Sequence, residues 1–375
     1  MTERYDAIVV GVGGMGSAAT YHLAKRGLDV LGLERFDIPH TRGSSHGITR
    51  IIRKPQFEHP AYVPLVGRAY ELWDALEERS GRELLHVTGG LDIGPPESHV
   101  FSGSVRSCEA HNIDHEILSA AEVRDRFPGY ELPESHRAVY QSDGGFLVPE
   151  QCIIAHVEAA QQEGADVRAR EPVSDFTQLA DGGMGVSTQT DTYETDELVV
   201  TAGAWARELL PELTDLAVPE RQVLAWLQPT DPPLFEPENF PVFVHEADDG
   251  SYYGFPRYDV PGFKVGKFNH LEETAAPEEM EEPGAEDEQL LRAYAERYFP
   301  AGAGPTMRLS TCMFTNTPDE HFILDTLPDR PQITVGAGFS GHGFKFASVI
   351  GEILADLAVG ERPEHDIELF GLSRF

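Results

Sequence analysis

One segment near the start of the chain, residues 5–34, constrains the fold more than any other. A short apolar run at 5–10 is typical of a buried strand. Apolar residues at helical spacing follow over 17–26, Gly27 ends that pattern, and 28–33 is a second apolar run. The segment therefore predicts a complete βαβ unit at the beginning of the chain.

The turn between the first strand and the helix contains Gly11, Gly13, Gly14 and Gly16. In a Rossmann-like turn the first glycine permits the bend, the second lets a pyrophosphate approach the backbone, and the third lets helix and strand pack closely. Glu34 ends the second strand, where a carboxylate can accept hydrogen bonds from both ribose hydroxyls of an adenosine. This unit predicts binding of an ADP group and leaves FAD and NAD both open.

The charge of the chain excludes several partners. It has 29 basic and 63 acidic residues and a formal net charge of -34, which argues against nucleic acid as a ligand. Acidic residues are spread along the whole chain and concentrated at 278–288, a pattern that favours a protein kept hydrated in concentrated salt. No apolar run is long enough to cross a bilayer, so we expect a cytoplasmic protein with no membrane partner, and a monomer.

Cysteine and lysine are both scarce. The cysteines, Cys108, Cys152 and Cys312, are too few and too far apart for a disulfide framework or a zinc site, and we expect no metal. Arginine supplies most of the positive charge, because the chain has only five lysines, at positions 25, 54, 264, 267 and 345. Lysines that remain in such a chain are enriched for sites that need a compact ammonium group.

A loop rich in small and hydroxyl residues follows the second strand. Its backbone could cradle a phosphate, and its cationic or ionisable side chains could face an anionic ring or a carboxylate. The alternative is a solvated basic turn. The candidate residues of this loop are Arg35, Ser44, His46, Thr49, Arg50 and Arg53.

Further pieces of a nucleotide domain lie far along the chain. Residues 197–205 predict a strand that enters a glycine turn and then a helix. Near the C-terminal end, residues 310–325 read Ser-Thr-Cys-Met-Phe-Thr-Asn-Thr-Pro-Asp-Glu-His-Phe-Ile-Leu-Asp, and residues 336–345 read Gly-Ala-Gly-Phe-Ser-Gly-His-Gly-Phe-Lys. This arrangement favours one long dinucleotide bound by the whole chain, hence FAD, over a separate NAD module.

These two C-terminal segments, together with the glycine turn and the loop after it, resemble the monomeric sarcosine oxidase family of covalent flavoproteins. That family includes N-methyltryptophan oxidase and pipecolate oxidase. The resemblance runs from about residue 5 to about residue 360, with four motifs in the family order. It implies that Cys312 carries FAD through a thioether to the 8α-methyl carbon, a reaction that needs a thiolate and is assisted by nearby cations.

The resemblance also implies a set of residues around the cofactor. Glycines before a helix that starts near Phe344 let the chain run close beneath the flavin ring, and the helix N-terminus faces the part of the ring that gains negative charge. The expected cofactor-binding residues are Gly11, Gly13, Gly14, Gly16, Glu34, Arg35, Ser44, His46, Thr49, Arg50, Cys312, Gly338, Gly341, Gly343 and Lys345.

For the substrate, the resemblance implies that Arg53 and Lys345 bind a carboxylate, that Gly341 contributes its carbonyl group and that His342 lines the same region. Lys264 precedes an apolar-glycine pair, as does the family lysine that promotes reduction of oxygen. Residues 252–256 and 262–267 predict a hairpin of the substrate domain, with Tyr253 at the site.

Two departures from the family pattern concern the substrate. Phe268 stands where sarcosine oxidase has a histidine, with His270 two residues further on, and Phe314 stands where it has a tyrosine. Both changes remove polar groups from the expected pocket, so the sequence favours a substrate bulkier or more apolar than sarcosine.

The predicted fold class is mixed α/β. We expect a Rossmann-like FAD-binding domain built from residues 1–85, 144–210 and 306–375, and a substrate domain on a mixed, largely antiparallel sheet built from 86–143 and 211–305.

The predicted function is FAD-dependent oxidation of a secondary amino acid, N-methyl or cyclic, to an imine, with oxygen reduced to hydrogen peroxide. Three alternatives stay open at this point. They are an amine dehydrogenase that passes electrons to a carrier protein, a nicotinamide-dependent dehydrogenase, and a non-catalytic flavin-binding protein.

Overall fold

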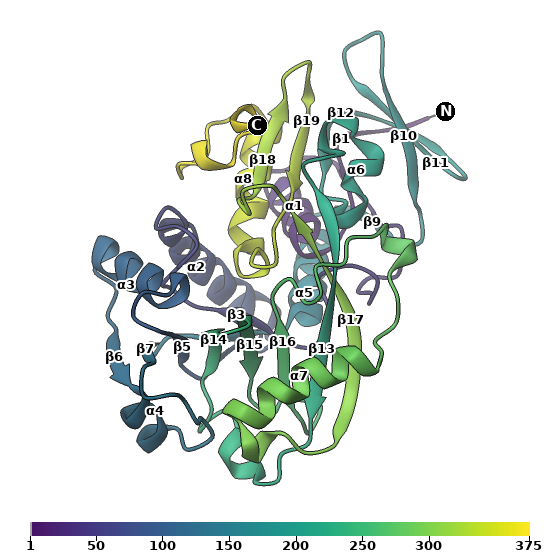
Figure 1. Cartoon of the computed structure of the whole chain (residues 1–375). Coiled ribbons are helices and arrows are strands. Elements are labelled where there is room, and N and C mark those ends of the chain that lie inside the picture. The colour runs from purple at the N-terminus through teal and green to yellow at the C-terminus, as the bar shows by residue number, and fades with distance from the viewer. Residues whose placement is uncertain (1) are drawn as a thin grey trace.

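A computed structural model describes residues 2–375 and contains two large sheets (Figure 1). The first sheet has a parallel centre in which β1 lies between β2 and β12, β9 extends it beyond β2, and β19 pairs with the end of β12. A β10–β11 hairpin pairs antiparallel with the beginning of β12, and β18 pairs antiparallel with β19. The strands are β1 (Glu3–Val10), β2 (Val30–Leu33), β9 (Asp166–Arg168), β10 (Val173–Gln178), β11 (Met184–Thr188), β12 (Thr192–Val200), β18 (Ile323–Leu327) and β19 (Arg330–Ala337).

The helices that cover this sheet confirm the predicted βαβ unit. Helix α1 (Gly14–Lys25) connects β1 to β2 and packs against α5 (Pro149–Gln162) and α8 (Ala347–Ala358), while α2 (Tyr62–Ser80) lies against α5 and α8. A Cβ atom added at Gly351 would lie 2.4 Å from the Cβ atom of Ala18, so α1 and α8 approach each other closely. The buried side chains of these helices and of β1 form one apolar core.

The second sheet is largely antiparallel, as predicted. Its strand order is β17-β13-β16-β15-β14-β5-β7-β6, and β14 and β5 are its one parallel pair among the described residues. Its strands are β5 (Gly90–Gly94), β6 (Glu116–Ser119), β7 (Arg137–Gln141), β13 (Val218–Leu227), β14 (Val242–Ala247), β15 (Gly250–Phe255), β16 (Phe263–Lys267) and β17 (Thr306–Asn316). The predicted hairpin of residues 252–267 is the antiparallel pair β15 and β16.

Helices cover one face of the second sheet, and the other face lies toward the first sheet. Helix α7 (Ala285–Tyr298) lies across the sheet (Figure 1), and an aromatic core fills the space between them, with the rings of Tyr252 and Tyr294 stacked 3.7 Å apart. Because side chains alternate along a strand, Tyr253 and Lys264 point to the opposite face from Tyr252. That alternation directs the candidate residues away from the core.

Shorter elements complete the chain. Helices α3 (His99–His111) and α4 (Ala120–Arg126) lie beside the second sheet, and α6 (Ala206–Leu209) follows β12. A small sheet pairs β8 (Gly145–Leu147) with β3 (Arg50–Ile52) on one side and β4 (Leu85–Val87) on the other. Within residues 2–375, no helix is both long enough and apolar enough to span a bilayer.

The domain limits stay a proposal. Strand β17 pairs with β13 in the second sheet, although residues 306–316 fall in the range assigned to nucleotide binding. The same strand brings Cys312 to the border between the two sheets, so its position serves the site whichever domain it is counted with.

Candidate functional site

The strands of the parallel sheet end at one edge, and a single large pocket opens there. Gly11 follows β1, Glu34 follows β2, Thr201 follows β12 and Gly338 follows β19. Ligands of open parallel sheets bind beyond the carboxyl ends of the strands. The empty volume of this pocket is about 1880 Å³ including its open mouth, and it continues from these turns to the inner face of the second sheet.

The glycine turn after β1 is shaped by close packing and leaves its middle open. A Cβ atom at Gly16 would lie 1.8 Å from the carbonyl oxygen of Gly11, so this position packs helix against strand. A Cβ atom at Gly13 would point into free space, with Ser45 Oγ as its nearest neighbour at 4.0 Å. The N-cap residue of helix α1 is Gly13, which has no capping side chain, and the first turn has no acidic residue. The Gly14 N–H donates to Ser45 Oγ at 3.3 Å, and the other N-terminal N–H groups are available to an anion.

Glu34 is held rigidly at the end of β2. Its Oε2 accepts the N–H of Val12 and its Oε1 accepts the N–H of Phe36, both at 2.9 Å. Each oxygen keeps a further lone pair. Arg35 lies beside it, with its guanidinium 5.5 Å from the ring of Trp205.

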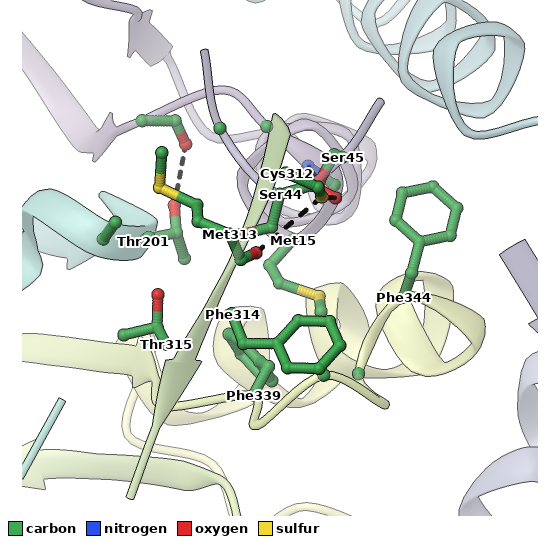
Figure 2. Close-up of a pocket in the computed structure, with 18 of the residues that line it drawn as sticks. Met15, Ser44, Ser45, Thr201, Cys312, Met313, Phe314, Thr315, Phe339 and Phe344 are labelled. Carbon is green, nitrogen blue, oxygen red and sulfur yellow. Dashed lines mark hydrogen bonds between the residues drawn. The ribbon is translucent and has the colours of Figure 1, made fainter. Parts of the chain in front are cut away.

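The loop after Glu34 brings a thiol and a guanidinium together. Arg50 Nη2 donates to the carbonyl oxygen of Ser44 at 2.7 Å and lies 3.4 Å from Cys312 Sγ. Figure 2 shows Cys312 beside Ser44 and Ser45 at one side of the pocket, with Phe314 and Phe339 at another. Arg50 and Cys312, which are 262 positions apart in the chain, thus meet at the side of the pocket.

Four of the predicted site residues do not line the pocket, namely Gly16, His46, Thr49 and Lys264. His46 is buried, neither of its ring nitrogens has a hydrogen-bond partner, and burial lowers its pKa to about 3. Lys264 is 1% exposed and donates to the carbonyl oxygens of Gly47 and Thr49 at 2.8 Å and to Thr49 Oγ1 at 2.9 Å. Burial, with the nearby Arg50 charge, holds the pKa of this ammonium well below its usual range. Lys264 therefore lies one residue layer behind the pocket wall.

The closed end of the pocket holds two buried cations, Arg53 and Lys345. Arg53 donates from Nη1 to the carbonyl oxygen of Pro55, its Nη2 lies 3.1 Å from Glu58 Oε1, and its Nε lies 3.3 Å from Asp92 Oδ1. Lys345 Nζ donates to the carbonyl oxygen of His342 at 2.6 Å.

Mutual charge interactions shift the pKa values of these groups. Burial lowers the pKa of Lys345 to about 7, with Arg53 adding to the effect and Glu58 opposing it. Burial alone would raise the pKa of Glu58, but the positive charges of Arg53 and Lys345 outweigh it and bring the pKa to about 2. Glu58 is therefore an anion, whereas Lys345 changes charge near neutral pH.

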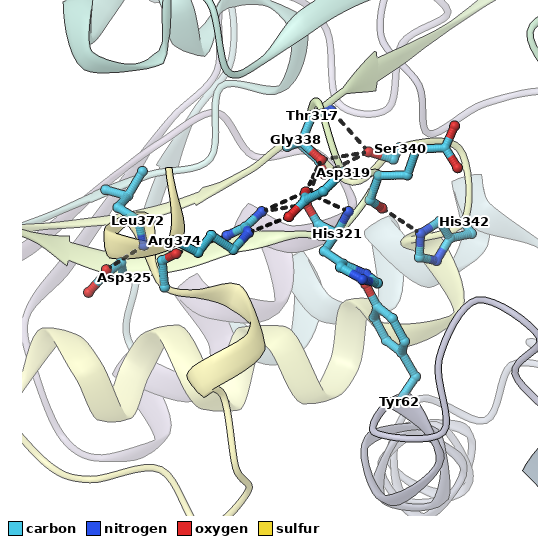
Figure 3. Close-up of polar contacts among 12 residues, drawn as sticks. Tyr62, Thr317, Asp319, His321, Asp325, Gly338, Ser340, His342, Leu372 and Arg374 are labelled. Atoms are coloured by element: carbon cyan, nitrogen blue, oxygen red, sulfur yellow. Dashed lines mark hydrogen bonds and ion pairs between the residues drawn. The ribbon is translucent and has the colours of Figure 1, made fainter.

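His342 has a defined tautomer. Its Nε2 lies 3.1 Å from the carbonyl oxygen of Glu320, and because a carbonyl only accepts, Nε2 carries the hydrogen. Its Nδ1 is a buried lone pair 3.9 Å from Glu58 Oε1, and burial lowers the pKa of the ring to about 4. Figure 3 shows Arg374 paired with Asp319, the residue before Glu320 in the chain.

Three aromatic residues, Tyr253, Phe268 and Phe314, form an aromatic wall of the same pocket. The rings of Tyr253 and Phe268 lie 4.9 Å apart, and those of Phe268 and Phe314 lie 5.8 Å apart. The backbone of Gly341 packs directly against the ring of Phe314, because a Cβ atom at Gly341 would lie 2.5 Å from that ring. Phe255 lines the same region with Lys264 Nζ 4.3 Å from its ring centroid.

The residues of the pocket fit FAD. The open position at Gly13 and the uncapped start of α1 suit a pyrophosphate, and the lone pairs of Glu34 suit a ribose. The other predicted residues that line the same pocket are Gly11, Gly14, Arg35, Ser44, Arg50, Arg53, Tyr253, Cys312, Gly338, Gly341, His342, Gly343 and Lys345.

The sequence interpretation missed several residues. Glu58 and Asp92 flank Arg53. Glu150 accepts the N–H groups of Gly47 and Ile48, and Phe255 also lines the pocket. Glu58, Asp92 and Glu150 lie on segments without a motif, and Phe255 lies in the predicted hairpin, of which only Tyr253 and Lys264 were expected at the site. Their roles depend on which side chain the fold brings opposite them, and no spacing in the sequence carries that information.

The chain is similar to known proteins along nearly its whole length. A family model described as FAD dependent oxidoreductase matches residues 6–357. The chain is 43% identical to a monomeric sarcosine oxidase of Streptomyces avermitilis, over 99% of this chain and 97% of that protein. It is 36% identical to an N-methyl-L-tryptophan oxidase of Yersinia pestis, over 99% of each chain. The solved structure of NikD, an unusual amino acid oxidase essential for nikkomycin biosynthesis, superposes with a TM-score of 0.85 at 27% identity, covering 99% of this chain and 98% of that one.

Proposed function

The chain belongs to the FAD dependent oxidoreductase family, and on that premise we propose that it oxidises an N-alkyl amino acid to an imine and reduces oxygen to hydrogen peroxide. One observation carries the proposal. The pocket that begins at the glycine turn ends at two buried cations, Arg53 and Lys345, so a small carboxylate and the cofactor share one cavity. Full-length relatives named monomeric sarcosine oxidase and N-methyl-L-tryptophan oxidase support the same substrate class.

When bound, FAD supplies the redox chemistry by accepting two electrons from the substrate and passing them to oxygen. The protein supplies binding and charge. Glu34 would hold the adenosine ribose, and the N–H groups around Gly13 and Gly14 would hold the pyrophosphate. The turns at Ser44 and at Gly341 would enclose the ring.

We propose that Cys312 tethers the cofactor. Its sulfur would form a bond to the 8α carbon, replacing the thiol hydrogen and one hydrogen of the methyl group. Oxygen would take up these two hydrogen atoms, with their electrons, and become hydrogen peroxide, so the step balances. The Arg50 guanidinium, 3.4 Å from the sulfur, supports this role because a nearby cation stabilises a thiolate.

The substrate carboxylate would bind at the closed end, where the two cations are not equally free. Arg53 donates from Nη1 to the Pro55 carbonyl oxygen and from Nη2 to Glu58, and its Nε lies near Asp92 without a hydrogen bond. Lys345 has one hydrogen-bond acceptor, the His342 carbonyl oxygen. A carboxylate would therefore meet an unpaired charge at Lys345, but at Arg53 a charge that Glu58 and Asp92 already flank. Lys345 is the primary anion-binding residue in this proposal.

The aromatic wall would face the alkyl part of the substrate. Phe268 and Phe314 line the pocket with aromatic rings. Polar side chains at these two positions could have hydrogen-bonded a small substrate, and the rings cannot. An apolar wall binds larger alkyl or aromatic groups by removing their surface from water. We propose that the preferred N-alkyl amino acid is larger or more apolar than sarcosine.

The overall reaction balances with water and oxygen. The substrate loses two electrons and two protons in forming the imine, oxygen gains them as hydrogen peroxide, and water hydrolyses the imine. An N-methyl substrate thus gives formaldehyde and the demethylated amino acid. Burial disfavours the charged form of Lys264, but three hydrogen-bond acceptors around its Nζ favour the ammonium. We propose that this ammonium favours the oxygen step, because its positive charge stabilises superoxide without donating a proton.

Oxygen consumption with a substrate panel tests this function. Purified protein in concentrated salt is mixed with sarcosine, N-methylated amino acids with larger side chains, and cyclic secondary amino acids, while oxygen and peroxide are both followed. We expect consumption with equal amounts of peroxide, and faster turnover for the larger substrates. A flavin-containing protein that consumes no oxygen with any of them contradicts the proposal.

A further inference from the structure

Residues 47–49 form a tight turn directly before Arg50. The Thr49 N–H donates to the Gly47 carbonyl oxygen at 2.9 Å, which closes a γ-turn with Ile48 at its centre. Gly47 and Ile48 have φ values of 95° and 75°. A left-handed φ is unfavourable for a β-branched residue, so contacts from outside must hold this turn.

Glu150 and Lys264 hold the turn from opposite sides. Glu150 Oε1 accepts the N–H groups of Gly47 and Ile48 at 2.8 and 3.1 Å. Lys264 Nζ donates to the carbonyl oxygens of Gly47 and Thr49. Glu150 Oε2 is buried without a hydrogen-bond partner, so this carboxylate has lost its water in exchange for contact with the turn.

The 47–49 turn also sets the position of Arg50. Arg50 Nη1 donates to the Thr49 carbonyl oxygen at 2.9 Å, and Nη2 donates to the Ser44 carbonyl oxygen while lying beside Cys312 Sγ. The direction of the Thr49 carbonyl group depends on the γ-turn. A relaxed turn would therefore remove one of the two anchors that aim the guanidinium at the thiol.

We propose that Glu150 is a positioning residue that, through the 47–49 turn, holds Arg50 against Cys312 and so promotes formation of the flavin–cysteine bond. This inference rests on the attachment at Cys312 proposed above. The active feature of Glu150 is its oxygen as a double hydrogen-bond acceptor. A glutamine at this position keeps that acceptor and should keep the function.

The test separates cofactor binding from cofactor attachment. Full-length apoprotein, made in riboflavin-limited cells, is mixed with FAD in concentrated salt and precipitated with acid at intervals. Flavin absorbance is read in pellet and supernatant. Glu158→Gln is the matched control, because Glu158 lies on the same helix and pairs with Arg82 at the surface.

We expect Glu150→Ala to bind FAD but to attach it at least about tenfold more slowly than the wild type, and Glu150→Gln and the control to stay within about threefold. Because glycine adopts a left-handed φ without strain, Ile48→Gly combined with Glu150→Ala should recover much of the lost rate. A role in stability alone would not separate attachment from binding in this way.

Two results would overturn the inference. One is a wild-type attachment rate in Glu150→Ala, and the other is a Glu150→Gln rate as low as that of Glu150→Ala with no recovery in the double variant. The double variant keeps the test decisive even if Glu150→Ala alone does not fold. A wild type that binds FAD but leaves no flavin in the pellet would instead overturn the attachment at Cys312.

Discussion

Lys345 and Arg53 carry the positive charge at the closed end of the pocket, but the protein engages them differently. Carboxylates of Glu58 and Asp92 flank Arg53, so its charge is largely balanced before any ligand arrives. Lys345 has no ion pair among the described residues, and its pKa lies near 7. At the residue scale, the charge of Lys345 decides how strongly the free pocket attracts an anion.

Binding of a small carboxylate without an amine group should therefore depend on pH. Below pH 7 Lys345 is protonated and the affinity should be constant; above about pH 7 it should fall by about tenfold per pH unit, as the ammonium is lost. The pKa of Glu58, about 2, and that of His342, about 4, lie outside this window. Titration of the flavin absorbance with acetate from about pH 5.5 to about pH 9 measures it.

The matched variant for this experiment is Lys345→Met, which should bind acetate weakly and without pH dependence in the same range. A wild-type affinity that does not change across the window would contradict the role given to Lys345.

Lys264 is the second residue whose charge can be tested alone, because the role proposed for that charge concerns only the reaction with oxygen. Lys264→Met should slow reoxidation of the reduced flavin by oxygen about 100-fold, since the charge that stabilises superoxide is gone, while anaerobic reduction by substrate stays nearly unchanged. Stopped-flow absorbance measures both steps on the fraction of protein that carries attached flavin, because Lys264 also binds the 47–49 turn. Lys267→Met, on the same strand, is the control and should keep both rates. Unchanged oxygen kinetics in Lys264→Met would remove this residue from the oxygen step.

At the scale of elements, the parts that repeat a local pattern were predictable and the parts that depend on long-range contacts were not. The βαβ unit and the β15–β16 hairpin follow from periodicity and turn residues, and both are present. The resemblance to a known family supplied the residues at Cys312 and Lys345. Glu150 gave no signal, because its contact with Gly47 joins residues 103 positions apart.

The β1–α1 turn allows packing to be tested apart from ligand binding. Gly13→Ala should fold normally but lose FAD, because its methyl group meets free space in the protein and would occupy the path of the pyrophosphate. Gly16→Ala should destabilise the fold by more than about 4 kcal/mol, because its methyl group would overlap the Gly11 carbonyl oxygen. Thermal unfolding and flavin content measure the two effects. Normal flavin content in Gly13→Ala would contradict the assigned position of the pyrophosphate.

At the scale of the whole molecule, the acidic surface should make the stability of the fold depend on salt. The net charge of -34 produces repulsion that dissolved salt screens. In the predicted acidic stretch, Glu278, Glu279, Glu281 and Glu282 are exposed, whereas Asp287 is buried and pairs with Arg221. The exposed carboxylates would repel one another least in concentrated salt.

Thermal stability should rise with salt for this reason. The screening length falls from about 10 Å at about 0.1 M salt to about 3 Å at about 1 M, so the midpoint of unfolding should increase by several degrees over that range. Calorimetry in potassium chloride measures it. A midpoint that is independent of salt would contradict the proposed adaptation.

Anaerobic mixing of the purified protein with an N-methyl amino acid is the most direct test of the central claim. The absorbance of the oxidised flavin should disappear after mixing with a substrate, because the flavin accepts its electrons. Air should then restore it, with one peroxide formed for each flavin. A flavin that keeps its absorbance with every N-alkyl amino acid in the panel would contradict the assignment of the protein as an amine oxidase.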